Sequence, residues 1–216
     1  MISPKARSNP PYFLPTEKSI FDIYLNSISK MRKFMFEDLQ KSIDAGSNFV
    51  VAGALCTYTE TWGKLLEGIP EGQSERCFNA FFRRLGACYV KLLDDGRDIY
   101  GMVRCGLIHF YGIDGGLSVV NMAKGSCGIT FTIDPTRGDR TLLDLMNYPK
   151  VGEKCSFNIL TYFDDFKKAV DEYIALLQKD LPVQNPSSPE FAGVYPVKNN
   201  LHVNLYEVLS HKSIVI

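Results

Sequence analysis

The stretch SNFVVAGALCTYTETWGKLLE, residues 47–67, decides the expected fold more than any other part of the chain. Ser47 is a residue type that begins helices, and Gly68-Ile69-Pro70 is a helix-ending sequence. A helix that is apolar on all sides is normally buried, so we predict that this one lies at the centre of the fold. Its apolar residues are Val50, Val51, Ala54, Leu55, Tyr58, Trp62, Leu65 and Leu66.

Four further helices are expected around this central one. In residues 17–45, apolar side chains recur every three or four positions, which predicts a long helix with one buried stripe that ends at Gly46. The remaining helices are predicted from Ser74 to the stop at Asp94-Asp95-Gly96, from about Asp98 to Tyr111, and from Asp164 to Lys179.

The periodicity changes from helical to alternating between the fourth and fifth helices. Residues 117–122 and 129–133 are predicted to be strands joined around Lys124-Gly125-Ser126, with a third strand at 155–160. A helical turn is expected between them at 141–146. The predicted fold class is therefore mainly α: an up-and-down bundle of four to five helices, with a small antiparallel β-sheet inserted at about residues 116–160.

The chain length and the prolines indicate the domain organisation. A length of 216 residues favours one domain with appendages. Prolines at 4, 10, 11 and 15 predict an extended arm over residues 1–15, followed by the helical domain at 16–180. Residues 181–216 begin with a linker rich in Pro, Ser and Asn and include a possible edge strand at 201–205.

The composition restricts the classes of partner. Lys plus Arg equals Asp plus Glu at 24 each, so any nucleic-acid site must be local. The six cysteines contain no Cys-x-x-Cys pair, which favours reduced thiols in the core. Neither a signal peptide nor a membrane span is expected, so the sequence predicts a cytoplasmic protein without membrane contact.

The segment RCGLIH, residues 104–109, carries the most suggestive chemistry in the chain. On an α-helix, Arg104 and His109 would lie about 140° apart around the axis and about 7.5 Å apart along it. Both are polar residues in a strongly apolar segment, which calls for a partner or a function. The spacing alone is also compatible with a structural role, in which an Arg and a His occur near each other by chance on an amphipathic helix.

An imidazole and a guanidinium are suited to cleavage of an RNA phosphodiester. The imidazole can deprotonate a 2′-hydroxyl or protonate the leaving oxygen, while the guanidinium binds the phosphate. This route needs no metal, and no His or carboxylate cluster has the spacing of metal ligands. We therefore expect neither a metal nor another cofactor.

The block YGMVRCGLIHFY, residues 100–111, resembles the signature helix of the HEPN superfamily, in which an Arg is followed after four to six residues by a His. Many members are prokaryotic ribonucleases of toxin or phage-defence type that act as dimers with their motifs facing each other. The resemblance implies that Arg104 and His109 are the catalytic pair, with His109 in acid–base work and Arg104 at the phosphate. It also covers residues 17–179 more loosely, through Glu60-Thr-Trp-Gly63 and the segment 157–177.

Several other residues are candidates for the site. Glu60 is expected either to orient Arg104 or His109 or to sit at a solvated edge, and Tyr100 and Tyr111 either to bind the phosphate or to fill the core. The position after the arginine is often Asn, Asp or His in active members, whereas this chain has Cys105. One basic group is expected either to approach RNA or to form a solvated face, and it consists of Arg76, Arg83, Arg84 and Arg97.

The sequence thus predicts a metal-independent endoribonuclease that is a homodimer, cuts RNA, and is restrained by an antitoxin or another neighbouring-gene protein. The departure at Cys105 keeps open a catalytically inactive HEPN-like module for binding or dimerisation. A helical scaffold unrelated to RNA is the third possibility.

Overall fold

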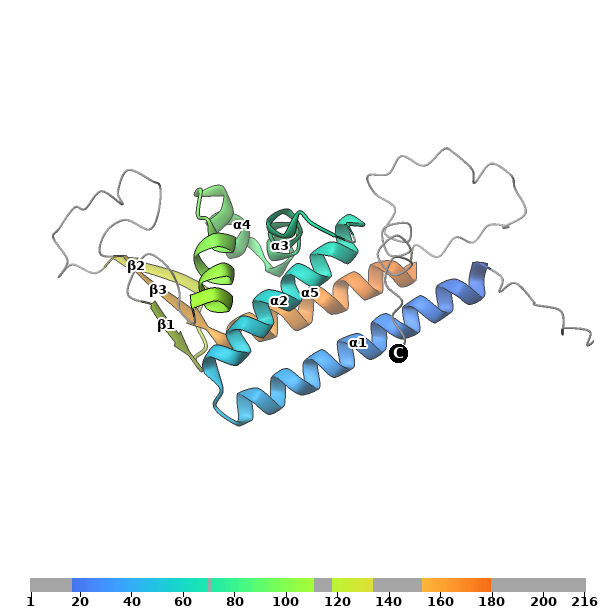
Figure 1. The fold of residues 1–216 in the computed structure, drawn as a ribbon, viewed down its shortest axis with the longest axis horizontal. Coiled ribbons are helices and arrows are strands. Elements are labelled where there is room, and N and C mark those ends of the chain that lie inside the picture. Colours follow the sequence, from blue (N-terminus) through green and yellow to red (C-terminus); the bar gives the residue numbers. More distant parts are fainter. Residues whose placement is uncertain (1–16, 70, 111–117, 134–152, 180–216) are drawn as a thin grey trace, which may run out of the picture.

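The structure, a computed structural model, describes residues 17–69, 71–110, 118–133 and 153–179. These residues form a mainly helical fold with a small three-stranded sheet at one end (Figure 1). The helical elements are α1 (Glu17–Asp44), α2 (Asn48–Glu67), α3 (Ser74–Phe82), the 3-10 turn η1 (Arg83–Leu85), α4 (Ala87–Asp94), the π-helix η2 (Tyr100–Phe110) and α5 (Ile159–Lys179). The strands are β1 (Ser118–Asn121), β2 (Ile129–Ile133) and β3 (Glu153–Asn158).

The prediction of a central helix over residues 48–67 is confirmed. Leu55, Cys56 and Trp62 of α2 are fully buried, and α2 contacts α1, α3, α5 and η2. The Trp62 ring packs near the rings of Phe81 and Tyr173, with centroids 6.2 and 5.9 Å away. The core is therefore organised around α2, with aromatic side chains filling the space between it and its neighbours.

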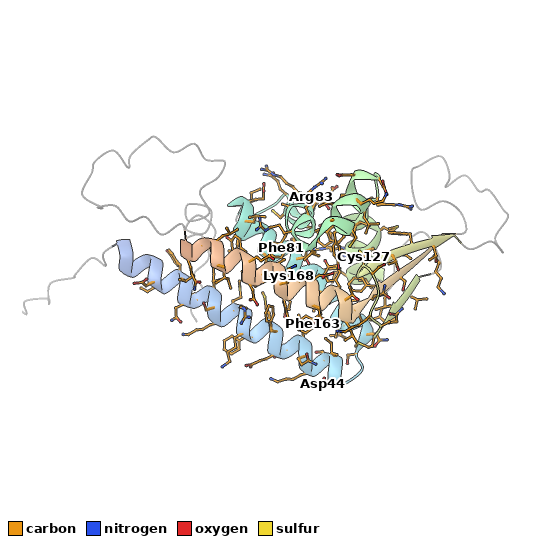
Figure 2. All side chains as sticks on the ribbon, turned by 180° about the vertical axis from the view of Figure 1, so that it is seen from behind. Asp44, Phe81, Arg83, Cys127, Phe163 and Lys168 are labelled. Atoms are coloured by element: carbon orange, nitrogen blue, oxygen red, sulfur yellow. The ribbon has the colours of Figure 1, made fainter. Side chains whose placement is uncertain are left out.

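The long first helix also agrees with the prediction, since α1 ends at Asp44 just before Gly46, whose φ is +72°. Ile28 and Leu39 on its apolar stripe are buried. Arg32 donates a hydrogen bond through Nη2 to Oδ2 of Asp171 at 3.0 Å and thereby ties α1 to α5. In Figures 1 and 2 these two helices run side by side along the length of the molecule.

Helices α2 and α3 approach each other unusually closely at Gly63. A Cβ placed on Gly63 would lie 1.8 Å from the backbone oxygen of Cys77. The added carbon would collide with the backbone of α3, which cannot move aside as the end of a flexible side chain could. The crossing therefore requires glycine at this position.

The prediction of one continuous helix from Ser74 to Asp94 is wrong. The chain forms α3, the turn η1 and α4, with a break at Gly86, whose φ is +141°. This φ lies in a region that side-chain-bearing residues rarely adopt, so the break depends on the glycine. Apolar periodicity alone does not reveal such a change of direction.

The segment 100–110 is helical as predicted, but it is a π-helix rather than an α-helix. Its backbone hydrogen bonds join residues five positions apart instead of four. The angle of about 140° expected between Arg104 and His109 on an α-helix therefore does not apply. In η2 the two residues stand about one turn apart and far closer to the same side of the helix.

The sheet is mixed, so the prediction of an antiparallel sheet is wrong. The strand order is β1-β3-β2, with β3 parallel to β1 and antiparallel to β2. Phe157 of β3 is fully buried and faces Val120 on one side and Ile129 on the other. Strand β3 lies between the other two strands, and β1 and β2 are therefore not paired with each other. Strand β3 also ends at Asn158, and α5 begins at Ile159 instead of Asp164.

The segment between β1 and β2 is bound to the helices instead of forming a hairpin turn. Gly125 donates its backbone N–H to Thr161 Oγ1 of α5 at 2.7 Å. Gly128 donates to the hydroxyl of Tyr89 at 3.1 Å, and this hydroxyl donates to Asp165 Oδ2 at 2.6 Å. These bonds fix one end of the sheet to both α4 and α5.

Several predictions lie outside the described residues: the arm at 1–15, the helical turn at 141–146, and the linker and edge strand within 181–216. Within the described part of the chain, no helix has the uninterrupted apolar length that a bilayer crossing requires.

Replacing Gly63 by alanine tests the close crossing of α2 and α3. We expect Gly63→Ala to lower the free energy of unfolding by roughly 2–4 kcal/mol, because the added methyl collides with the backbone of α3. Gly53→Ala on the same helix is the control. Its Cβ would meet Ile108 Cδ1 at an ordinary 3.5 Å, so helix propensity should leave it neutral or stabilised by up to about 1 kcal/mol. Urea unfolding measures both, and equal stability of the two variants would refute the crossing.

Candidate functional site

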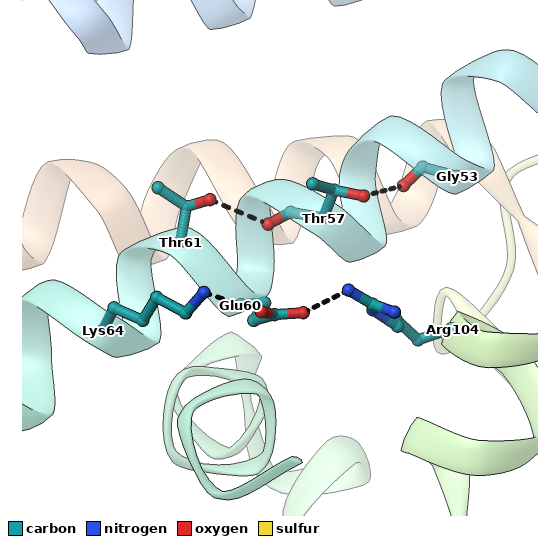
Figure 3. Close-up of polar contacts among 6 residues, drawn as sticks. All are labelled: Gly53, Thr57, Glu60, Thr61, Lys64 and Arg104. Carbon is teal, nitrogen blue, oxygen red and sulfur yellow. Dashed lines mark hydrogen bonds and ion pairs between the residues drawn. The ribbon is translucent and has the colours of Figure 1, made fainter. Parts of the chain in front are cut away.

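A buried carboxylate, that of Glu60, joins two cations at the interface of α2 and η2 (Figure 3). Its Oε2 accepts a hydrogen bond from Nη2 of Arg104 at 2.6 Å. Its Oε1 pairs with Nζ of Lys64 at 2.9 Å. Lys64 follows Glu60 by four positions on α2, so the helix places the two side chains on one face, whereas Arg104 comes from η2.

The side chain of Arg104 is largely buried but keeps some contact with solvent. Its side chain retains 17% of its exposure, and its guanidinium carbon lies 5.3 Å from the ring centroid of Tyr100. A hydrogen bond also links Arg104 to Cys105, the residue after it. Its Nε is buried and has no acceptor among the described residues. Arg104 is thus held by one strong charged contact and an aromatic face.

The charges around Glu60 stabilise its ionised form. Burial raises the pKa of this carboxyl, but hydrogen bonds from Lys64 and Ser74 and the positive charges of Arg104 and Lys64 outweigh burial and lower the pKa below its usual value. Burial lowers the pKa of Arg104, yet the negative charge of Glu60 reverses this and raises the pKa above its ordinary value. Both partners therefore stay charged at neutral pH.

Burial raises the pKa of the Tyr100 hydroxyl, against the charge of Arg104, which lowers it. Ser74, the first residue of α3, lies close enough for its hydroxyl to help lower the pKa of Glu60 and to act against the rise in the pKa of Tyr100. The site therefore draws on three helices that are far apart in the sequence.

His109, the second member of the expected catalytic pair, is exposed near the end of η2. It lies one π-helical turn beyond Arg104. Of the two contacts expected for Glu60, with Arg104 or with His109, the structure shows the one with Arg104. The alternative of a solvated edge for Glu60 is wrong, because only 5% of the residue is exposed. Tyr111 lies outside the described residues.

The four arginines expected to approach RNA have separate surroundings. Arg76 pairs with Glu67 at 2.8 Å, and Arg83 pairs with Asp94 at 2.9 Å. The guanidinium carbon of Arg97 lies 4.6 Å from the ring centroid of Phe131, and Nε of Arg84 is buried. Much of this positive charge is thus compensated locally and does not form a concentrated basic patch.

Two site residues, Lys64 and Ser74, were missed at the level of sequence. Lys64 carries a usable signal, since it is a cation one turn after a carboxylate on an otherwise apolar helix. Ser74 carries no such signal, because its proximity to Glu60 arises only when α3 crosses α2 at Gly63.

Neither a disulfide nor a metal centre is formed by the described residues. All six cysteines lie outside any disulfide, and burial raises the pKa of Cys56 well above its usual value. Within the described ranges, no group of three or more His, Cys, Asp or Glu side chains has an arrangement that would hold a metal ion.

Comparisons of this chain with protein-family models, with curated proteins and with solved structures find no match. The resemblance to the HEPN superfamily therefore rests on the residues of the chain itself.

The lowered pKa of Glu60 gives stability a specific pH dependence. A carboxyl whose folded pKa lies below its ordinary value of 4.5 adds stability above that value and loses it as the pH falls through the folded pKa. The wild type should therefore exceed Glu60→Gln in unfolding free energy most at neutral pH, and the difference should shrink below about pH 4.5.

Chemical denaturation between pH 7 and pH 3 measures this difference. Asp164, whose pKa is lowered by hydrogen bonds from Lys124 and Lys167, is present in both proteins, so its pH-dependent contribution to stability cancels in the difference. Thr57→Val, on the same helix, removes a hydrogen bond to the Gly53 carbonyl without changing charge, so its difference from the wild type should not vary with pH. If the difference in unfolding free energy between the wild type and Glu60→Gln also stays constant with pH, the carboxylate is not paired as described.

Proposed function

We propose that the protein is a metal-independent endoribonuclease of HEPN type, with Arg104 and His109 as its catalytic pair. One observation carries the proposal: Glu60 holds the Arg104 guanidinium through a hydrogen bond of 2.6 Å, and His109 is exposed one turn further along the same π-helix. A fixed cation beside an accessible imidazole is the arrangement that cleavage by a 2′-hydroxyl requires.

In this mechanism, His109 in its neutral form accepts the proton of a ribose 2′-hydroxyl. The oxygen attacks the adjacent phosphorus, a 2′,3′-cyclic phosphate forms, and the bond to the 5′-oxygen of the next nucleotide breaks. The leaving oxygen takes a proton from an imidazolium. Arg104, whose pKa is raised by Glu60, remains charged throughout and stabilises the negative charge that grows on the phosphate oxygens.

One imidazole cannot be base and acid for the same phosphodiester at the same moment. A second copy of the chain with its η2 facing the first would supply the second His109, so the proposed active form is a homodimer. The exposed Ile108 beside His109 provides apolar surface for such a contact. A toxin or phage-defence role, in the cytoplasm and under an antitoxin partner, completes the proposal.

The zero net charge and the locally paired arginines favour recognition of shape over non-specific attraction to RNA. A structured RNA, such as a transfer RNA, is accordingly the proposed substrate.

A catalytically inactive HEPN-like module for binding or dimerisation is the second candidate. It is favoured by Cys105, in place of the polar residue of active members, and by the small exposed fraction of Arg104. In that case the Glu60–Arg104 pair would serve only to attach η2 to α2.

Incubation of total RNA with the purified protein in EDTA tests the activity. We expect the wild type to cleave, and Arg104→Ala and His109→Ala each to lose roughly 10²–10⁴-fold in rate, because each removes one part of the catalytic pair. Arg32→Ala, which removes an arginine from the ion pair with Asp171 on α5, should retain the activity.

Circular dichroism shows whether the variants are folded, and sedimentation gives the oligomeric state. Equal RNA cleavage by the wild type and both catalytic variants, or none by any of them, would exclude the nuclease. If none of the proteins cleaves RNA but the wild type is a stable dimer, the inactive binding or dimerisation module is the remaining candidate.

A further inference from the structure

Glu60 contacts its two cations with a different oxygen each. Oε1 pairs with Lys64 and Oε2 with Arg104, at 2.9 and 2.6 Å. Both oxygens belong to one carboxylate, so the ammonium and the guanidinium are separated by a span that one small oxyanion can bridge. A phosphate group offers similarly spaced oxygens and carries more of them.

The carboxylate and the cations differ in their access to solvent. The Glu60 side chain is 6% exposed, whereas those of Lys64 and Arg104 are 21% and 17% exposed. The three groups carry a net charge of +1, and the cations have unused donors, including the buried Nε of Arg104, which has no acceptor among the described residues. A positive site with spare donors therefore reaches the surface above a buried counter-ion.

The immediate surroundings also favour an anion. Ser74, whose hydroxyl helps to lower the pKa of Glu60, is the first residue of α3, so the positive end of that helix dipole lies near the cluster. The Tyr100 ring covers one side of Arg104 and limits its hydration. Glu60 neutralises only part of this positive potential.

We propose that Lys64 and Arg104 together form a phosphate-binding site, in which Glu60 is the resting counter-ion and competes with the phosphate for both cations. The inference rests on the proposed function for the identity of the ligand, an RNA phosphate. It adds Lys64 as a second phosphate-binding residue and gives Glu60 a role in setting the affinity. The retained carboxylate excludes weakly charged ligands, because a ligand must offer more negative charge than Glu60 to displace it.

Binding of inorganic phosphate to the full chain, measured by calorimetry at low ionic strength, tests the site without any cleavage. Glu60→Gln should bind phosphate about tenfold more tightly, because the competing charge is gone. Lys64→Met should bind it about tenfold more weakly, because one of the two cations is lost.

Two controls make the same chemical changes elsewhere. Glu67→Gln, on the same helix as Glu60, frees Arg76 of α3, and Lys91→Met removes an exposed cation that pairs with Asp95 at the end of α4. Neither should change phosphate affinity by more than about twofold, which is the effect of net charge alone at an exposed position. If Lys64→Met fails to fold, Lys64→Gln, which keeps a hydrogen-bond donor without the charge, replaces it.

The opposite signs of the two effects are the decisive result. A purely structural triad would respond to both substitutions with lower thermal stability and no gain in phosphate affinity, and that result overturns the proposal. If the opposite signs are found while RNA is not cleaved, the phosphate site stands and the proposed nuclease fails. If RNA is cleaved and the signs are not opposite, the nuclease stands and the two-cation site fails.

Discussion

The burial of α2 on nearly all sides is the constraint on which the rest of the structure depends. Four other helical elements contact this helix, and its large side chains, Trp62 and Leu55 among them, are withdrawn from water. Burial of this kind supplies the main stabilising free energy of the fold. It also makes any polar group on the helix costly unless that group is paired, and Glu60 is such a group. The ion pairs of Glu60 with Arg104 and Lys64 are thus a consequence of where α2 lies.

The packing of α3 against α2 links this core to the site. Because Gly63 lets the two backbones come together, the first turn of α3 reaches the level of Glu60, and Ser74 joins the polar cluster. Glu60 itself lies one turn before Gly63 on the same helix. The close crossing of α2 and α3 therefore also determines which side chains surround the Glu60 carboxylate.

The elements that could be predicted from the sequence are those whose residues interact locally. The periodic stripe of α1 and the apolar α2, each ended by a glycine, lie within a residue or two of the expected bounds. The break at Gly86 was missed because the apolar periodicity continues across it, and the order of the strands was missed because it depends on pairing between distant segments. Strand β1 pairs with β3, and the segment that follows β1 binds α5 through Gly125 instead of turning back as a hairpin, which no local pattern encodes. Likewise, Arg104, His109 and Glu60 were recognisable as unusual polar residues in apolar surroundings, whereas Ser74 became part of the cluster only through the tertiary fold.

The π-helical form of η2 affects how many residues can separate two functional groups on one helix. In a uniform α-helix, one additional residue between two functional groups would rotate the second group by a large angle and separate them. A local change to five-residue hydrogen bonding takes up the additional residue within a single turn. The number of residues between a guanidinium and an imidazole can then change by one without moving the two groups to opposite sides of the helix, because the pitch of the helix that carries them changes as well.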